Sequence, residues 1–243
     1  MNYCIANWKM NKNFTESEDF INTLRNESFS PNTKAIICPP SIFLKDMIDK
    51  AKNIELEIGA QNFFHKEVGA FTGEISSSML KSIDCNYSIV GHSERREYFK
   101  ERNSDICCKI SLALKSEIKP VLCIGESLEV REKGKTFNFL SSQLSKSLND
   151  IDKSSPFLLA YEPIWAIGTG NVPSTKEISE IFNFIDKYLK NSLNIDVKIP
   201  LIYGGSVSPD NAKDIISVDL VSGFLIGGSS LDVESYISIY KQM

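Results

Sequence analysis

The chain has 243 residues, of which 42% are hydrophobic and 24% are charged, an ordinary balance for a globular protein of one domain. Its formal net charge of -4, with Lys and Arg scattered along the chain, is a poor match to nucleic-acid binding. No segment approaches the roughly 20 apolar residues that cross a bilayer, and no signal-peptide pattern is visible, so we expect a cytoplasmic protein with no membrane partner.

Eight short apolar segments follow one another along the chain, and each has the length of a buried strand. They span residues 3–8, 34–39, 56–61, 87–91, 120–125, 157–163, 199–205 and 223–228. Most are apolar almost throughout rather than alternating with polar residues. This pattern is typical of strands that are covered on both faces, and it predicts a parallel sheet.

Longer amphipathic segments separate these strands and predict helices. We expect one helix within residues 15–28, with a cap signal at Thr15 or Ser17, and one long helical segment within residues 127–150. Residues 174–193 begin with Ser174 and Glu177 at the spacing of a capping box. The alternation predicts an α/β fold, but periodicity alone fits an open doubly wound sheet as well as a closed barrel. The absence of glycine from "NWKMNK", after the first strand, weakens a dinucleotide-binding interpretation.

The cysteines favour free thiols. Four lie in or beside strand-like segments, two are adjacent in a helical pattern, and none forms a Cys-x-x-Cys; they are Cys4, Cys38, Cys85, Cys107, Cys108 and Cys123. We therefore expect buried thiols of a reducing compartment rather than disulfides or a metal site.

Functional groups of parallel α/β proteins collect at the carboxyl ends of the strands, so the strand ends are the places to search. Lys9 follows the first strand and is a candidate for anion binding, although a lone lysine is more often a surface residue. His92 lies where the fourth strand passes into a helix, whose dipole disfavours a charged imidazole. A histidine packed only for structure remains the alternative. The other histidine, His65, is expected to be solvated.

Glu162 ends the sixth strand, and Pro163 restricts it to an extended backbone. A carboxylate that is withdrawn from water becomes a stronger base. Residues 163–173 have proline at both ends, apolar side chains near the start and Gly-Thr-Gly at the tip. We interpret this segment as a lid with hinges at its ends, and an ordinary loop with an apolar anchor is the alternative.

The last two strands both end in Gly-Gly-Ser, at residues 204–206 and 227–229. Such turns expose backbone N–H groups, and this pair of loops frequently forms a phosphate site in barrels. Neither a spaced set of metal ligands nor a nucleotide phosphate loop is present in the sequence, so we expect no metal and no cofactor.

The stretches "NWKMN", "GAFTGEIS", "VGHSERR", "CIGE", "AYEPIWAIGTG", "YGGSV" and "LIGGSSL" together resemble the triose-phosphate isomerase family, in the family's order and over nearly the full chain. The resemblance implies a (β/α)8 TIM barrel as a single domain over residues 1–243. It also implies a homodimer that interconverts dihydroxyacetone phosphate and glyceraldehyde 3-phosphate through an enediolate, in glycolysis and gluconeogenesis, without a cofactor.

The resemblance also implies roles for individual residues. Glu162 matches the family's base, and His92 matches a neutral electrophile that polarises the carbonyl group. Lys9 matches the lysine that stabilises the enediolate, with Asn7 as a nearby donor, and both belong to the substrate-binding set. Glu94 resembles a partner that orients the charged cluster.

Further positions match the family's binding elements. The residues expected to hold the phosphate through backbone groups are Gly168, Ser206, Gly227 and Gly228. Thr72 lies on the stretch that matches the interdigitating loop, which reaches toward the partner subunit's site. Pro173 departs from the small residues expected at the far hinge of the lid, which affects expectations for its motion and not for the chemistry.

Three other functions are weighed against this one. A Schiff-base aldolase needs a buried lysine at a central strand end, for which Lys9 is the only obvious candidate. A metal-dependent sugar-phosphate epimerase needs ligands that the sequence lacks. A barrel without activity, kept for binding, predicts the loss of a catalytic group, yet Lys9, His92 and Glu162 are all present.

Overall fold

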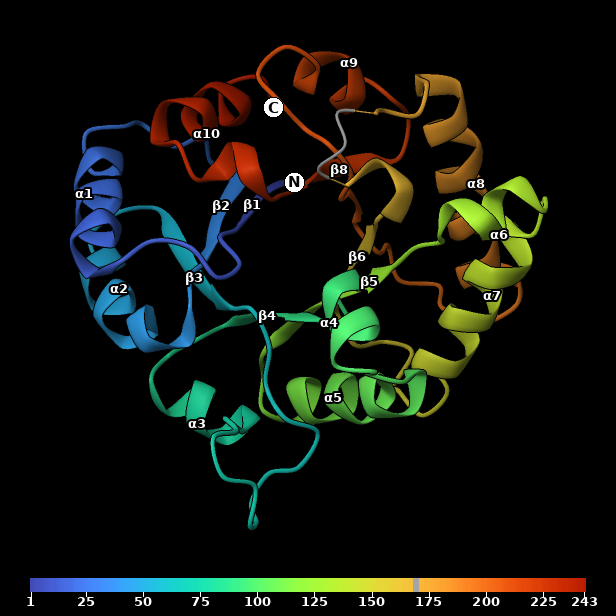
Figure 1. Cartoon of the computed structure of the whole chain (residues 1–243), viewed down its shortest axis with the longest axis horizontal. Coiled ribbons are helices and arrows are strands. Elements are labelled where there is room, and N and C mark those ends of the chain that lie inside the picture. The colour runs from blue at the N-terminus through green and yellow to red at the C-terminus, as the bar shows by residue number, and fades with distance from the viewer. Residues whose placement is uncertain (168–170) are drawn as a thin grey trace.

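The eight apolar segments form a closed parallel barrel, which excludes the open doubly wound sheet (Figure 1). The computed structural model describes residues 1–167 and 171–243. Each strand pairs with its neighbours in the sequence, and β1 pairs with β8 to close the ring. The strands are β1 (Asn2–Asn7), β2 (Thr33–Cys38), β3 (Leu56–Ala60), β4 (Tyr87–Val90), β5 (Lys119–Ile124), β6 (Leu158–Tyr161), β7 (Leu201–Tyr203) and β8 (Val221–Ile226).

Helices form an outer ring around the barrel, as Figure 1 shows. The α-helices are α1 (Phe14–Leu24), α2 (Leu44–Ala51), α3 (Ser77–Ser82), α4 (Ser93–Tyr98), α5 (Asn103–Lys115), α6 (Leu128–Glu132), α7 (Thr136–Ser147), α8 (Thr175–Asn191), α9 (Ala212–Ile216) and α10 (Val233–Tyr240). Short 3-10 helices are η1 (Ser41–Phe43), η2 (Ile164–Ala166) and η3 (Gly228–Ser230).

Burial of both strand faces explains the continuous apolar segments. In β1, Tyr3 and Ile5 pack in a cluster with inward residues of the other strands, while Cys4 and Ala6 pack in the larger cluster with the helices. Successive side chains of a strand point to opposite faces, so a strand buried on both faces needs apolar residues at nearly every position.

Helix boundaries differ from the sequence-based expectations in two places. The cap of α1 is Asn13, whose side chain accepts from the Glu16 N–H in a capping box, and neither Thr15 nor Ser17 is the cap. The expected long segment 127–150 is broken into α6 and α7 at Gly134, which has a φ of 64°. The capping box of Ser174 and Glu177 at the start of α8 is confirmed.

All six cysteines are free, as expected, but Cys108 is exposed on α5 rather than buried. Its neighbour Cys107 is buried, because adjacent residues of a helix face directions about 100° apart. No helix among residues 1–167 and 171–243 has both the length and the apolar character needed to cross a membrane.

Candidate active site

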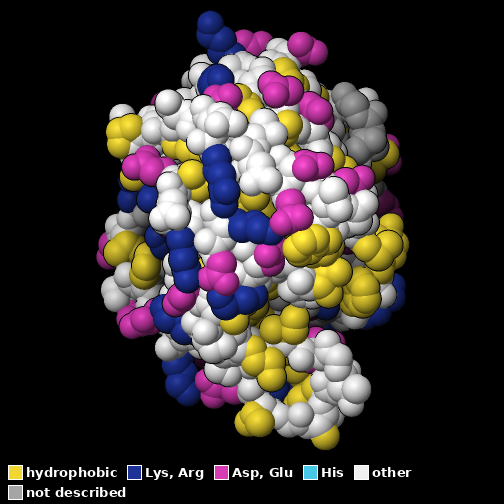
Figure 2. Space-filling model, turned by 90° about the vertical axis from the view of Figure 1, so that its left-hand side faces the viewer, with side chains coloured by type: hydrophobic (Ala, Val, Ile, Leu, Met, Phe, Trp, Pro, Cys, Tyr) yellow, Lys and Arg dark blue, Asp and Glu magenta, His cyan; other side chains and the backbone are white. Residues whose placement is uncertain are grey.

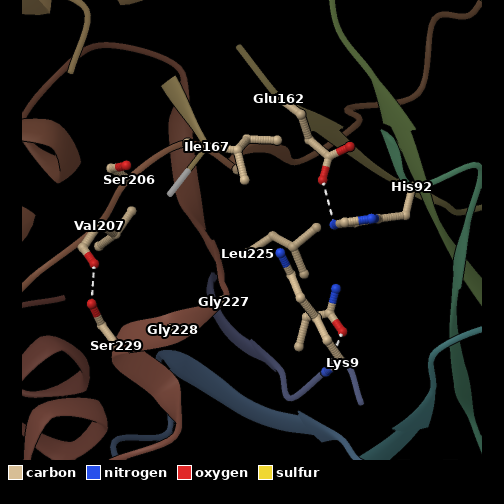
Figure 3. Close-up of a pocket in the computed structure, with 13 residues that line it drawn as sticks. Lys9, His92, Glu162, Ile167, Ser206, Val207, Leu225, Gly227, Gly228 and Ser229 are labelled. Atoms are coloured by element: carbon tan, nitrogen blue, oxygen red, sulfur yellow. Dashed lines mark hydrogen bonds and ion pairs between the residues drawn. The ribbon is translucent and has the colours of Figure 1, made fainter. Parts of the chain in front are cut away.

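A pocket opens at the carboxyl end of the barrel, where the residues after β1, β4, β6, β7 and β8 meet (Figure 3). The side chains and backbone groups that line it are Asn7, Lys9, His92, Glu162, Ile167, Gly204, Gly205, Ser206, Val207, Leu225, Gly227, Gly228 and Ser229. The pocket therefore brings together most residues that the sequence predicted for one site.

Glu162 is held at the end of β6 by the strands on both sides. Its N–H donates to the Ile124 carbonyl at 2.7 Å, and its side chain is only 2% exposed. A Cβ atom on Gly125 would lie 1.8 Å from the Glu162 carbonyl oxygen, and one on Gly204 would lie 3.0 Å from its Cγ. The close packing around Glu162 thus requires glycine at position 125, while a side chain at position 204 would press on the Glu162 side chain.

The Glu162 carboxylate has two partners within the site. Its Oε2 accepts a hydrogen bond from the Ser93 N–H at 3.0 Å, and its Oε1 lies 3.0 Å from His92 Nε2. The carboxylate therefore points toward the start of α4, and Figure 3 shows the Glu162–His92 contact as a dashed line.

His92 is the N-cap residue of α4 and is buried. Its Nδ1 accepts a hydrogen bond from the Glu94 N–H at 3.3 Å, so Nδ1 carries no proton in this arrangement and Nε2 is the donor to Glu162. Burial lowers the pKa of His92, but the Glu162 and Glu94 carboxylates together raise it by more, so the net pKa is above the ordinary value. The expectation of a disfavoured charge rested on the helix dipole alone, and these carboxylates act against it.

Lys9 has a left-handed backbone with a φ of 54°, and its N–H donates to Asn7 Oδ1 at 3.2 Å. Its Nζ lies 2.7 Å from Glu94 Oε1. A Cβ atom on Gly227 would lie 3.6 Å from this Nζ, so the ammonium group borders the turn after β8. The expected proximity of Lys9, Asn7 and Glu94 is observed.

The two glycine-serine turns form the other wall of the pocket. Ser206 Oγ donates to the Ala166 carbonyl at 2.5 Å, and Ser229 Oγ donates to the Val207 carbonyl at 2.6 Å. The serines thus join each turn to a neighbouring segment, and Gly227 and Gly228 line the pocket with little side-chain bulk. Gly168 lies outside the residues that the structure describes.

The start of the expected lid, up to residue 167, is anchored by Glu126. The buried Glu126 Oε1 accepts from Tyr161 OH and from Trp165 Nε1, both at 3.1 Å. Burial raises the pKa of Glu126, and the hydrogen bond from Trp165 opposes that effect. The guanidinium carbon of Arg131 lies 4.3 Å from the centre of the Trp165 ring.

Some supporting residues had no signal in the sequence. Gln61 Nε2 donates to the carbonyl groups of Lys9 at 2.8 Å and Cys38 at 2.9 Å. Arg96 donates to the carbonyl groups of Gly91 and Cys123 at 2.7 and 2.9 Å. Both link neighbouring strand ends, and only the closed barrel brings their partners into reach.

Thr72 and His65 lie on the long connection between β3 and α3, which projects from the barrel in Figure 1. Thr72 is exposed and does not line the pocket of its own chain. His65 was expected to be solvated and is half-buried, with its ring centre 4.2 Å from that of Phe64.

Across the described residues 1–167 and 171–243, no three His, Cys, Asp or Glu side chains are grouped as metal ligands would be. The polar groups of the pocket instead include one buried carboxylate, one imidazole, one ammonium group, one carboxamide and two glycine-rich turns. This set can accept a proton, donate a hydrogen bond and balance negative charge.

Comparison with known proteins gives one consistent result. The family model described as triosephosphate isomerase matches residues 2–243. The triosephosphate isomerase of Chlamydia muridarum is 41% identical, over 99% of this chain and 91% of that protein. That of Finegoldia magna is 43% identical, over 95% of this chain and 94% of that protein. That of Flavobacterium psychrophilum is also 43% identical, over 96% of this chain and 96% of that protein.

Proposed function

The chain belongs to the triosephosphate isomerase family and interconverts dihydroxyacetone phosphate and glyceraldehyde 3-phosphate, a step of glycolysis and gluconeogenesis, and we propose that Glu162, His92 and Lys9 carry out this reaction. The convergence of these three side chains on one pocket supports the proposal most strongly. The three residues follow different strands, β1, β4 and β6, and the barrel brings them together although they are far apart in the sequence.

Glu162 is the general base of the proposed mechanism. Its carboxylate takes a proton from the carbon beside the substrate carbonyl and returns it to the neighbouring carbon, so no net proton is gained or lost. Its place in the pocket beside His92 supports this role, since a general base must lie within hydrogen-bond reach of the proton that it removes. The substrate must draw the carboxylate away from the Ser93 N–H and His92.

His92 supplies a neutral hydrogen-bond donor. The Glu94 N–H occupies Nδ1, which leaves the Nε2 proton for the substrate carbonyl oxygen. Nε2 gives this proton to that oxygen and takes the hydroxyl proton from the neighbouring oxygen, so the oxygens exchange a proton as the carbons do. The Glu162 carboxylate opposes the effect of burial and raises the pKa of His92 in the free protein. Once Glu162 turns to the substrate, this contribution weakens and burial keeps the imidazole neutral.

Lys9 and Asn7 stabilise the negative charge that develops on the enediolate oxygens. A fixed ammonium group is effective, because it needs no reorganisation during the reaction. Glu94 orients this group through the contact between its Oε1 and Lys9 Nζ.

The turns after β7 and β8 hold the substrate phosphate. Backbone N–H groups of Ser206, Gly227 and Gly228 serve this purpose, together with that of Gly168 from the lid. Closure of residues 163–173 over the bound substrate then excludes water and protects the enediolate from loss of phosphate.

The protein acts as a cytoplasmic homodimer in this proposal. Large hydrophobic side chains lie exposed after β1, β2, β3 and β4; they include Met10, Ile42, Val68, Tyr98 and Phe99. Figure 2 shows hydrophobic side chains gathered at one edge of the face in view and on the projecting loop below it. A second copy that covers this surface would receive the loop carrying Thr72.

A coupled assay of the purified protein with glyceraldehyde 3-phosphate tests the cofactor-free mechanism. Turnover should be the same with and without a metal chelator. Activity that disappears with the chelator and returns with a divalent metal would contradict this mechanism and favour a metal-dependent one.

A further inference from the structure

Lys12 has a backbone conformation that is costly for a lysine. Its φ is 70°, in the left-handed region, and it lies between β1 and α1 in the same loop as Lys9. A residue with a Cβ atom persists in this region only where its surroundings stabilise it. The contacts of the Lys12 side chain can supply this stabilisation.

The side chain of Lys12 crosses to the turn after β8. Its Nζ donates to the Leu231 carbonyl at 2.8 Å, 219 residues away in the sequence. The same ammonium group lies 5.1 Å from the centre of the Trp8 ring and 4.9 Å from that of Phe20. Burial lowers the pKa of Lys12, and the carboxylates of Glu16 and Asp232 oppose this effect.

The Leu231 carbonyl belongs to the end of the turn that lines the pocket. The Leu231 N–H donates to the Gly228 carbonyl at 3.0 Å, and the Ser230 N–H donates to the Gly227 carbonyl at 2.9 Å. Ser230 Oγ also donates to the Gly227 carbonyl, at 2.7 Å. Ser230 thus holds the start of the turn, while Lys12 holds its end from outside the pocket.

We infer that Lys12 is a positioning residue for phosphate binding, which fixes the turn after β8 so that the Gly227 and Gly228 N–H groups face the substrate phosphate. This inference depends on the proposed phosphate site. Because Lys12 and Lys9 share one loop, the contact also fixes the phosphate turn relative to the loop that bears the Lys9 ammonium group.

Three variants separate the contributions of Lys12. Lys12→Met keeps an unbranched chain against the two rings and removes the ammonium group. Lys12→Gly removes the same group and also relieves the strain of the left-handed backbone, because glycine adopts this conformation readily. Lys12→Arg keeps a donor that can reach the carbonyl group. Lys100→Gly is the matched control, since Lys100 is exposed and has a φ of 53°.

Affinity for inorganic phosphate is measured by amide chemical shifts of residues 227–229, together with kcat, KM and thermal unfolding. We expect phosphate affinity to fall about fivefold in Lys12→Met and Lys12→Gly, since a charge-assisted contact is lost. KM should rise by a matching factor, while kcat should stay within about twofold of the wild-type value. Lys12→Gly should not unfold at a lower temperature than Lys12→Met. Lys12→Arg should restore most of the affinity, and Lys100→Gly should leave affinity and kinetics unchanged.

The outcomes also separate this inference from the proposed function. If the wild-type protein binds phosphate at these amides and both Lys12→Met and Lys12→Gly bind it equally well, Lys12 has no positioning role. Recovery of affinity in Lys12→Gly but not in Lys12→Met would assign the effect to backbone strain and overturn the inference. If phosphate does not shift these amides even in the wild-type protein, the proposed phosphate site itself is wrong.

Discussion

The Nε2 atom of His92 lies 3.0 Å from Oε1 of Glu162, so the proposed electrophile and the proposed base contact each other in the free protein. The other carboxylate oxygen of Glu162 accepts from the Ser93 N–H. A substrate oxygen that takes the Nε2 proton must replace this carboxylate. Substrate binding and placement of the base are thereby coupled.

Replacement of Glu162 should lower the pKa of His92. Burial lowers that pKa, and in the wild-type protein the Glu162 and Glu94 carboxylates together outweigh it; Glu162→Gln removes the larger of these two opposing contributions. NMR titration of the His92 ring nitrogens measures the change, with His65 as the internal reference. An unchanged or higher pKa in the variant would show that Glu162 is not the cause of the shift.

The same interaction should make stability depend on pH. Because the folded-state pKa of His92 is raised, the charged pair stabilises the fold at pH values below the unfolded pKa of about 6.5. This contribution is lost as pH rises through the folded-state pKa. The advantage of wild type over Glu162→Gln in free energy of unfolding should therefore shrink over that interval, as followed by urea unfolding.

Loss of the Lys9 charge should impair catalysis more than loss of the Glu94 charge. Lys9→Met is expected to lower kcat/KM by about two to three decades, since a preorganised charge facing the enediolate is removed. Glu94→Gln should cost about tenfold or less, because its half-exposed carboxylate acts indirectly, through its contacts with Lys9 and His92. Steady-state kinetics provides the measurement, with Lys45→Met, in an exposed ion pair, as the control. A larger loss in Glu94→Gln than in Lys9→Met would reverse the assigned roles.

A methyl group on Gly125 should disturb the backbone of the base. Its Cβ atom would lie 1.8 Å from the Glu162 carbonyl oxygen, so Gly125→Ala is expected to cost roughly 3 kcal/mol of unfolding free energy and to reduce kcat. Gly134→Ala is the control, with a φ of 64° and no atom within 4 Å of the added Cβ; it should cost about 1 kcal/mol and leave kcat unchanged. Urea unfolding and kinetics distinguish the two variants. Equal effects on kcat would contradict the packing argument.

The projecting loop should control assembly. Thr72→Arg places a large charged group on this loop and is expected to weaken the proposed dimer and to make activity fall on dilution. Sedimentation velocity measures the oligomeric state. Asn149→Arg, at an exposed residue after α7, is the control. A wild-type protein that sediments as a monomer while fully active would rule out the role given to Thr72.

The strands were predictable because burial on both faces leaves a local trace in the sequence. Closure of the barrel left no such trace, since the contact of Tyr3 with Gly223 joins the two ends of the chain. Periodicity therefore could not separate an open sheet from a closed one, and the family resemblance was needed. The break at Gly134 was missed because a glycine near a helix end can be tolerated within a helix as well as terminate it.

The candidate site was predictable as a set of residues but not as a set of contacts. Strand ends identified Lys9, His92 and Glu162, because all parallel strands point their carboxyl ends to one side. The contact of Glu162 with the Ser93 N–H and the reach of Lys12 to Leu231 depend on side-chain directions. Those directions are set by packing between distant segments, which no local pattern encodes.

The exchange of substrate hydrogen with solvent tests the role of Glu162 most directly. Proton NMR follows deuterium incorporation into dihydroxyacetone phosphate in D2O, with wild-type protein and with Glu162→Gln. The proposal predicts incorporation several decades slower in the variant, while phosphate still binds at the amides of residues 227–229. Incorporation at a rate near that of the wild type, from a variant that lacks the carboxylate, would contradict the assignment of Glu162 as the base.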